Sequence, residues 1–128
     1  MKNRDYQNTS FKKSVTHAIE GLKTIIRDEK NFRRDLAIAA VVIVFGLRLK
    51  ISHSDWIAIS LVISMVFISE AMNSVIEAIC DTVSAEYKVN IKYAKDVAAG
   101  AVLISAIVSI ITGLLVFVPY ILEVIKRI

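Results

Sequence analysis

Carboxylates and an amide recur along one segment at spacings that bring them together on a helix. Glu70, Asn73, Glu77 and Asp81 follow one another at intervals of three or four residues, so on a helix they fall within an arc of about 80°. Hard divalent cations such as Mg²⁺ take oxygen ligands from one or two carboxylates together with substrate phosphates. The spacing therefore predicts a cation site suited to phosphate chemistry.

Glu70 differs from the other carboxylates because it follows directly on an apolar stretch. On a helix of ~1.5 Å per residue it lies about 21 Å from Trp56, inside the inner leaflet, and Glu77 lies near the cytoplasmic interface. An ionisable side chain inside a span costs on the order of 2.5 to 3.5 kcal/mol on insertion scales, so it is expected to be functional. At this depth Glu70 could accept a proton from a lipid hydroxyl.

The same carboxylates are compatible with two alternative roles. They could form ion pairs in a solvated bundle with nearby cations, namely Lys88, Lys92, Lys95 and Arg33. A glutamate inside the membrane is also the residue that a small proton-coupled transporter would use. A lysis or scaffold protein without chemistry is a further class.

The composition indicates an integral membrane protein. Of the 128 residues 55% are hydrophobic and the mean hydropathy is +0.59, whereas a soluble domain is roughly 45 to 50% apolar. The single cysteine, Cys80, excludes an internal disulfide. The pI is near 9.3, but Lys and Arg gather where apolar segments begin or end, which favours membrane anchoring over nucleic-acid binding.

The apolar pattern predicts one all-α membrane domain over residues 1–128. An amphipathic surface helix is expected at about 10–29, with Phe11, Val15 and Leu22 on its apolar side. Three transmembrane helices are expected at about 31–48, 55–83 and 95–122. The first two spans become long enough only if their helices extend beyond the apolar run, into polar residues.

The charge distribution predicts the orientation in the plasma membrane. Twelve of the 16 Lys and Arg residues lie before the first apolar stretch, which begins at Leu36, or between the second and third, at residues 70–96. This places the N-terminus in the cytoplasm and the C-terminus outside. Trp56 and Tyr120 mark the outer interface, as aromatic belts do. Pro119 is expected to be a helix-end residue.

Two further features concern packing and the site. Small residues recur every four positions in the third span, at Ala101, Ser105, Ser109 and Gly113. This stripe lets another helix approach closely, either within one subunit or between subunits. Glu29 falls on the apolar side of the surface helix, where it could be a second metal ligand, unless a break near Asp28 turns it to water. No standard phosphate-binding glycine loop is present in the sequence.

The segment EAMNSVIEAICD, followed by SAEYKVNIKYAKDVAAGAVLISAIV, resembles the small prokaryotic diacylglycerol kinase family, which includes undecaprenol kinases. The pattern ExxNxxIExxxD with AKD downstream is specific. The similarity extends to EGLKTIIRDEKNFR and covers most of residues 14 to 118.

The resemblance implies a homotrimer that transfers phosphate from ATP to a lipid hydroxyl at the cytoplasmic face, with active sites between subunits. By similarity Glu70 is the general base, Asn73 orients the reacting groups, and Glu29 and Glu77 hold Mg²⁺ on the ATP phosphates. The positions that look like ATP-binding residues are Glu29, Glu77, Glu86, Lys88, Lys95 and Asp96. His17 either touches ATP or sits on the solvated face.

The N-terminal pattern is more similar to the Gram-positive branch of the family, whose members favour undecaprenol. The expected acceptor is therefore undecaprenol, with diacylglycerol as the alternative. The transporter and scaffold alternatives leave Glu29, Glu77, Lys95 and Asp96 unexplained, because neither needs charged groups for a nucleotide at the interface.

Overall fold

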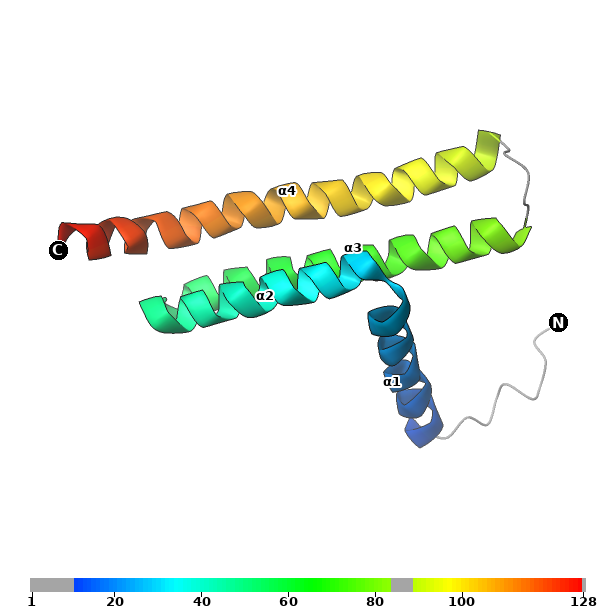
Figure 1. Ribbon diagram of the computed structural model, residues 1–128, viewed down its shortest axis with the longest axis horizontal. Helices are drawn as coiled ribbons and strands as arrows, with labels where there is room; N and C mark the ends of the chain where they lie inside the picture. Colours follow the sequence, from blue (N-terminus) through cyan, green and yellow to red (C-terminus); the bar gives the residue numbers. More distant parts are fainter. Residues whose placement is uncertain (1–10, 84–88, 128) are drawn as a thin grey trace.

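A computed structural model describes residues 11–83 and 89–127, and these residues form four helices. The helices are α1 (Phe11–Asp28), α2 (Lys30–Leu49), α3 (His53–Val83) and α4 (Val89–Lys126). Helices α2, α3 and α4 run side by side along the long axis, and α1 projects from the side of this bundle (Figure 1). The sequence predicted one helix in each of these regions, although α4 begins six residues before its predicted start at 95.

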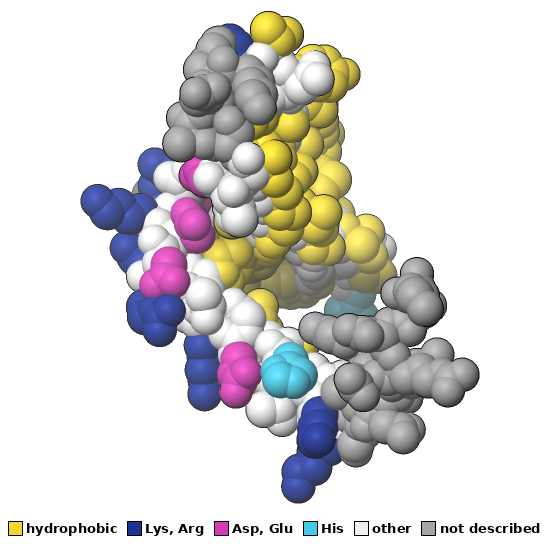
Figure 2. Space-filling model, turned by 90° about the vertical axis from the view of Figure 1, so that its right-hand side faces the viewer, with side chains coloured by type: hydrophobic (Ala, Val, Ile, Leu, Met, Phe, Trp, Pro, Cys, Tyr) yellow, Lys and Arg dark blue, Asp and Glu magenta, His cyan; other side chains and the backbone are white. Residues whose placement is uncertain are grey.

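Two of the described helices, α3 and α4, are long and apolar enough to cross a membrane. Helix α2 has 20 residues, which corresponds to about 30 Å, but charged residues occupy its first turns. Figure 2 looks onto the end of the molecule where α3 ends and α4 begins. It shows charged side chains along one edge and an extended apolar flank beside them.

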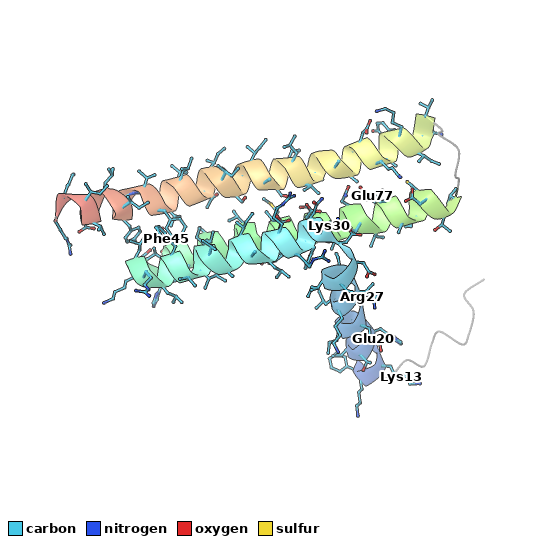
Figure 3. All side chains as sticks on the ribbon, in the orientation of Figure 1. Lys13, Glu20, Arg27, Lys30, Phe45 and Glu77 are labelled. Atoms are coloured by element: carbon cyan, nitrogen blue, oxygen red, sulfur yellow. The ribbon has the colours of Figure 1, made fainter. Side chains whose placement is uncertain are left out.

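Helix α1 is amphipathic and contributes no buried residue to the bundle. The side chains of its apolar face are exposed, with Phe11 at 84% and Leu22 at 57% of their full accessible area. Basic residues occupy the other face, including Lys13 and Arg27, which Figure 3 labels along the helix. This combination suits a helix that lies in the plane of the lipid headgroups.

The corner between α1 and α2 is formed at Glu29, whose backbone is extended (φ −98°, ψ 113°). Arg33 stabilises this corner because its Nη1 donates to the carbonyl oxygens of Ile26 (3.0 Å) and Arg27 (2.6 Å). These carbonyls belong to the last turn of α1, where intrahelical partners are lacking. Arg27 in turn donates to Asp28 at 2.7 Å, and this hydrogen bond holds the pKa of the Asp28 carboxyl below its usual value.

The turn from α2 to α3 is tightly packed. Lys50 adopts the left-handed conformation (φ 53°, ψ 49°) that ends α2. Gly46 faces the ring of Trp56, and a Cβ at this glycine would lie 2.9 Å from a ring carbon. Only glycine therefore fits at position 46 without a shift. Ile51 and Ile59 are buried beside this contact, at the start of a core that also includes Val116 of α4.

Tyr120 fastens α4 to the same turn. Its Oη accepts the backbone N–H of Ser52 at 2.9 Å and donates to Asp55 Oδ2 at 2.7 Å. The Ser52 hydroxyl donates to the same carboxylate at 2.7 Å. We call Ser52, Asp55 and Tyr120 the outer clamp, where outer names the end of the bundle at which α2 joins α3, and inner names the opposite end.

Pro119 lies inside α4, so the expectation that it ends the helix is wrong. Proline removes a single intrahelical N–H donor. On either side of it, Val116 is buried in the core and Tyr120 is held by the outer clamp. These contacts offset the missing hydrogen bond, and the helix continues to Lys126.

The small-residue stripe of α4 takes part in contacts within the subunit. Ser105 is only 2% exposed, and its hydroxyl lies 2.7 Å from that of Ser69 on α3. Ser109 and Gly113 line a groove between α2, α3 and α4, whereas Ala101 is exposed. The within-subunit alternative thus holds for Ser105, and contacts between subunits stay a prediction for the stripe.

Candidate active site

The face of α3 that carries Glu70, Asn73 and Glu77 lies in the C-terminal half of this helix, which approaches the corner between α1 and α2. Glu70 is buried, with 7% of its area exposed, Asn73 is half-buried and Glu77 is exposed. Asn73 Nδ2 donates to Glu77 Oε1 at 3.0 Å, as their spacing of four residues allows. Figure 3 labels Glu77 on α3 and Lys30, the first residue of α2.

Glu70 lies among other charged groups from three parts of the chain. The charges that act on it most strongly are those of Asp35, Arg34, Glu29 and Glu77, in that order. Within the described part of the chain, its carboxyl has no hydrogen bond or ion pair. Glu70 is therefore a buried carboxylate without a partner among the described residues.

Glu29 is half-buried at the corner where α1 ends. The break near Asp28 that the sequence left open does occur. Glu29 nevertheless remains close enough for its charge to act on Glu70. Its side chain forms no cap hydrogen bond with α2, so its carboxylate oxygens are not occupied by that helix end.

Asn73 provides an independent sign of a missing ligand. Its Oδ1 is buried and has no hydrogen-bond partner within residues 11–83 and 89–127, although such atoms are normally satisfied. Together with the carboxylates of Glu77 and Glu29 it offers oxygen atoms alone, the donor type that Mg²⁺ prefers.

No described group of three His, Cys, Asp or Glu side chains is close enough to hold a metal by itself. A site that also uses phosphate oxygens and water does not require such a cage. The residues therefore fit Mg²⁺ bound together with a nucleotide, and ligation by Glu29 and Glu77 stays a prediction.

Some of the other carboxylates are neutralised by lysines. Lys95 Nζ donates to Asp81 at 2.5 Å, joining α4 to α3, and Lys92 pairs with Asp96 one turn along α4. The ion-pair alternative thus holds for Asp81, and the pair of Lys92 and Asp96 is a further one that it did not include. Glu70 and Glu77 form no ion pair with any described residue, and Lys88, one of the expected partners, lies outside the described residues.

The remaining predicted positions are less informative. His17 is exposed on α1, and its Nδ1 lies 3.5 Å from Glu20 Oε2. In the single chain, His17 therefore lies on the solvated face, which is one of the two alternatives that the sequence left open. Glu86 and Lys88 lie outside the described residues.

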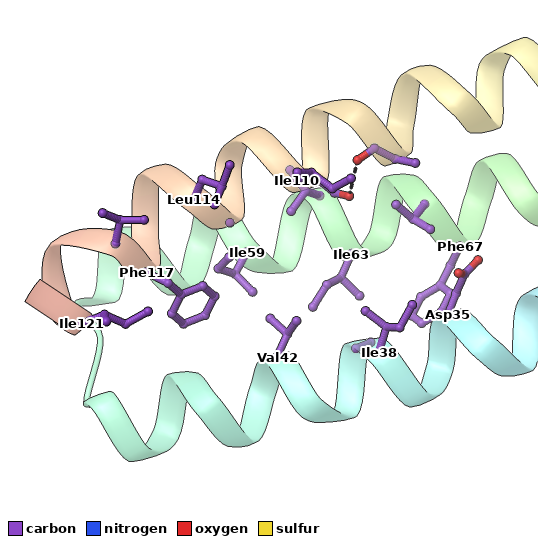
Figure 4. Close-up of a pocket in the computed structure, with 17 residues that line it drawn as sticks. Asp35, Ile38, Val42, Ile59, Ile63, Phe67, Ile110, Leu114, Phe117 and Ile121 are labelled. Carbon is purple, nitrogen blue, oxygen red and sulfur yellow. Dashed lines mark hydrogen bonds between the residues drawn. The ribbon is translucent and has the colours of Figure 1, made fainter.

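Sequence reasoning missed Asp35. This residue is half-buried on α2 and faces an apolar groove of about 450 Å³ between α2, α3 and α4 (Figure 4). The available signal was a carboxylate directly before the apolar run that begins at Leu36. In sequence it looks like the polar end of a span, and only the fold brings it near Glu70.

A buried carboxylate beside further oxygen-bearing side chains, in a bundle of apolar helices, is compatible with phosphate chemistry at a membrane. Comparison with known proteins agrees, because residues 16–117 match the model of the family described as prokaryotic diacylglycerol kinase.

Individual relatives cover most of the chain. The undecaprenol kinase of Bacillus subtilis is 37% identical over 121 residues, which cover 93% of this chain and 98% of that protein. The diacylglycerol kinase of Escherichia coli K12 is 30% identical over 104 residues, which cover 81% and 85%. The diacylglycerol kinase of Synechocystis is 32% identical over 111 residues, which cover 86% and 63%.

The chain belongs to the prokaryotic diacylglycerol kinase family. It is a lipid kinase of the plasma membrane that acts on lipid alcohols with ATP. This membership decides between the classes that the sequence left open, in favour of a kinase over a transporter or a scaffold.

Proposed function

We propose that this lipid kinase transfers the γ-phosphate of ATP to the hydroxyl of undecaprenol at the cytoplasmic surface of the membrane. The observation that carries the proposal is the 37% identity to the Bacillus undecaprenol kinase over nearly the full length of both chains. Diacylglycerol is the second candidate acceptor, supported by the 30% identity to the Escherichia coli diacylglycerol kinase.

Glu70 acts as the general base. Its buried carboxylate takes the proton of the acceptor hydroxyl as the oxygen forms a bond to the γ-phosphorus. The bond between this phosphorus and the β–γ bridging oxygen breaks, and ADP leaves with the electron pair. The products are a lipid monophosphate, ADP and a protonated Glu70, which returns its proton to water.

Asn73 and Glu77 position the reacting groups, since their mutual hydrogen bond fixes both side chains on one face of α3. Mg²⁺, when bound, would be held by Glu29 and Glu77 and would neutralise negative charge on the phosphate oxygens. Lys95 binds the nucleotide phosphates, and its ion pair with Asp81 breaks when it does so. Asp96, Glu86 and Lys88 contact the nucleotide. Positioning and charge neutralisation supply most of the catalysis in such reactions.

The active protein is a homotrimer with three spans per subunit, a cytoplasmic N-terminus and active sites between subunits. Helix α2 supplies the first of these three spans. The exposed apolar faces of α2 and α4 support this arrangement, as shown by Val41 at 67% and Leu115 at 73% exposure. Such faces need lipid or another subunit to cover them. The exposed Glu77 and the apolar face of α1 are likewise available to a neighbouring copy.

The purified protein in detergent micelles tests the acceptor. Labelled γ-phosphate from ATP is expected to appear on undecaprenol in the presence of Mg²⁺, and at a lower kcat/KM on diacylglycerol. A chelator should abolish transfer to both lipids. Preference for diacylglycerol would assign the second candidate, and transfer to neither lipid would refute the proposed function.

A further inference from the structure

A pair of hydroxyl groups joins α3 to α4 at the position directly before Glu70. Ser69 Oγ of α3 and Ser105 Oγ of α4 lie 2.7 Å apart, and Ser105 is only 2% exposed. The hydroxyl pair lies near the middle of both helices. Two other side-chain hydrogen bonds join these helices nearer to their ends, namely those of Asp55 with Tyr120 and of Lys95 with Asp81.

The link between the helices needs both hydroxyls. Each hydroxyl oxygen also lies within hydrogen-bonding distance of a carbonyl oxygen in its own helix, that of Val66 at 2.9 Å for Ser69 and that of Val102 at 2.8 Å for Ser105. Two hydroxyl protons cannot fill three hydrogen bonds, so one hydroxyl donates to the other, and the accepting hydroxyl donates to its own carbonyl. If either hydroxyl is removed, the remaining one turns to its own helix and the link is lost.

Glu70 depends on the backbone of α3 for its position. Its carboxyl forms no hydrogen bond or ion pair with any described residue, so no side-chain partner holds it in place. The turn of α3 that carries Glu70 is instead fixed on two sides. Phe67 packs on Phe32 of α2 with ring centroids 5.2 Å apart, and Ser69 contacts Ser105 of α4.

A movement of this turn against α4 would carry the Glu70 carboxyl with it, because the two positions are adjacent in the chain. Reacting groups must be held close to the productive geometry, and a displacement of ~1 Å can lower a rate by about 10²-fold. The contact that fixes Ser69 therefore controls where a base at position 70 lies.

We propose that the hydroxyl pair of Ser69 and Ser105 positions Glu70 for proton transfer. The two serines are positioning residues, because they act through the backbone of α3. Neither serine lines the groove between α2, α3 and α4, so a substitution leaves the lining of that groove unchanged. The pair thus sets the rate of transfer and not substrate binding. This inference rests on the proposed function, in which Glu70 is the general base.

Steady-state kinetics in detergent micelles separate positioning from binding. Ser69→Ala and Ser105→Ala should each lower the kcat for transfer to undecaprenol by roughly tenfold per folded molecule, as a displacement below 1 Å would. The KM values for undecaprenol and for Mg-ATP should stay within about twofold. The double variant should be no slower than either single variant, because each substitution alone breaks the link.

Ser64→Ala is the matched control on α3. The Ser64 hydroxyl donates to the carbonyl oxygen of Ser60 at 2.8 Å, and it makes no hydrogen bond to another helix within the described ranges. Its removal should leave the kcat at the wild-type value.

Two substitutions of similar size isolate the hydroxyl from the volume of the side chain. Threonine keeps a hydroxyl at position 69, and valine has a methyl group in its place while sharing the branched shape. Ser69→Thr should therefore retain most of the kcat, whereas Ser69→Val should lose it as Ser69→Ala does. A role in stability alone would lower the thermal midpoint without this difference in kcat.

The base itself provides a further test. In a chain that carries Glu70→Gln the base is absent, so the hydroxyl pair has no base to position. Adding Ser105→Ala to Glu70→Gln should leave the remaining rate within about twofold. A further tenfold loss would show that the pair acts through another group, and would overturn the proposal.

The outcomes distinguish this inference from the proposed function. Wild-type kcat values for both Ser69→Ala and Ser105→Ala would overturn the positioning role and leave the proposed function standing. A rise in KM with an unchanged kcat would overturn it as well, because positioning acts on the rate. If the wild type phosphorylates neither undecaprenol nor diacylglycerol, the proposed function fails and this inference fails with it.

Discussion

The polar groups compared at the two ends of the helical bundle differ in whether they have hydrogen-bond partners. At the outer end, Ser52, Asp55 and Tyr120 satisfy one another through hydrogen bonds of 2.7 to 2.9 Å. At the inner end, Glu70 is buried without a partner among the described residues, and Asn73 Oδ1 is an orphaned acceptor. Satisfied groups stabilise a fold, whereas unsatisfied groups at a fixed position are kept for a ligand. The outer end thus holds the helices together, and we propose that the inner end performs the reaction.

The strongest way to break this comparison is to neutralise Glu70. Glu70→Gln should lower the rate of phosphate transfer by roughly 10²- to 10⁴-fold, the usual contribution of a general base. The thermal midpoint in micelles should not fall, because the amide removes an unpaired buried charge. Transfer at the wild-type rate would show that another group takes the proton.

Neutralising Glu77 should affect nucleotide binding. Glu77→Gln should weaken Mg²⁺-dependent binding of ATP by about tenfold, as loss of an electrostatic ligand worth ~1.4 kcal/mol does. Isothermal titration calorimetry with and without Mg²⁺ measures this. Equal affinities for the variant and the wild type would move the metal to other residues.

At the outer end the same kind of substitution should affect stability instead. Gly46→Ala places a methyl group 2.9 Å from the Trp56 ring, and such overpacking costs typically about 1 to 3 kcal/mol. The free energy of unfolding in mixed micelles should fall by this amount. The kcat per folded molecule should stay at the wild-type value, and a drop in kcat would show that the two ends are coupled.

The smallest effect is expected from Tyr120→Phe. This change removes the hydroxyl that joins α4 to Ser52 and Asp55, at a cost of about 1 kcal/mol for a typical hydrogen bond. Tyr93→Phe is the matched control, because Tyr93 is 70% exposed on the same helix. Equal thermal midpoints for the two variants would show that the outer clamp does not stabilise the fold.

The sequence predicted what depends on local spacing. The intervals between Glu70, Asn73 and Glu77 placed them on one face of a helix, and the hydrogen bond between Asn73 and Glu77 follows from that periodicity. The amphipathic pattern likewise predicted α1 within a residue or two.

Features that depend on contacts between distant segments could not be predicted. Tyr120 and Asp55 are 65 residues apart, and Ser69 and Ser105 are 36 apart. No local pattern links such pairs. Asp35 was missed for the same reason, because its closeness to Glu70 arises only when α2 packs on α3. Pro119 was misjudged because its local preference was overridden by the packing around it.

The central claim is that the inner carboxylates serve catalysis and the outer clamp serves stability. The most direct test measures transfer of labelled γ-phosphate from Mg-ATP to undecaprenol, per folded molecule, for Glu70→Gln and Tyr120→Phe side by side. We expect almost no transfer by Glu70→Gln and the wild-type rate for Tyr120→Phe. Equal activities of the two variants would contradict this division between the ends of the molecule.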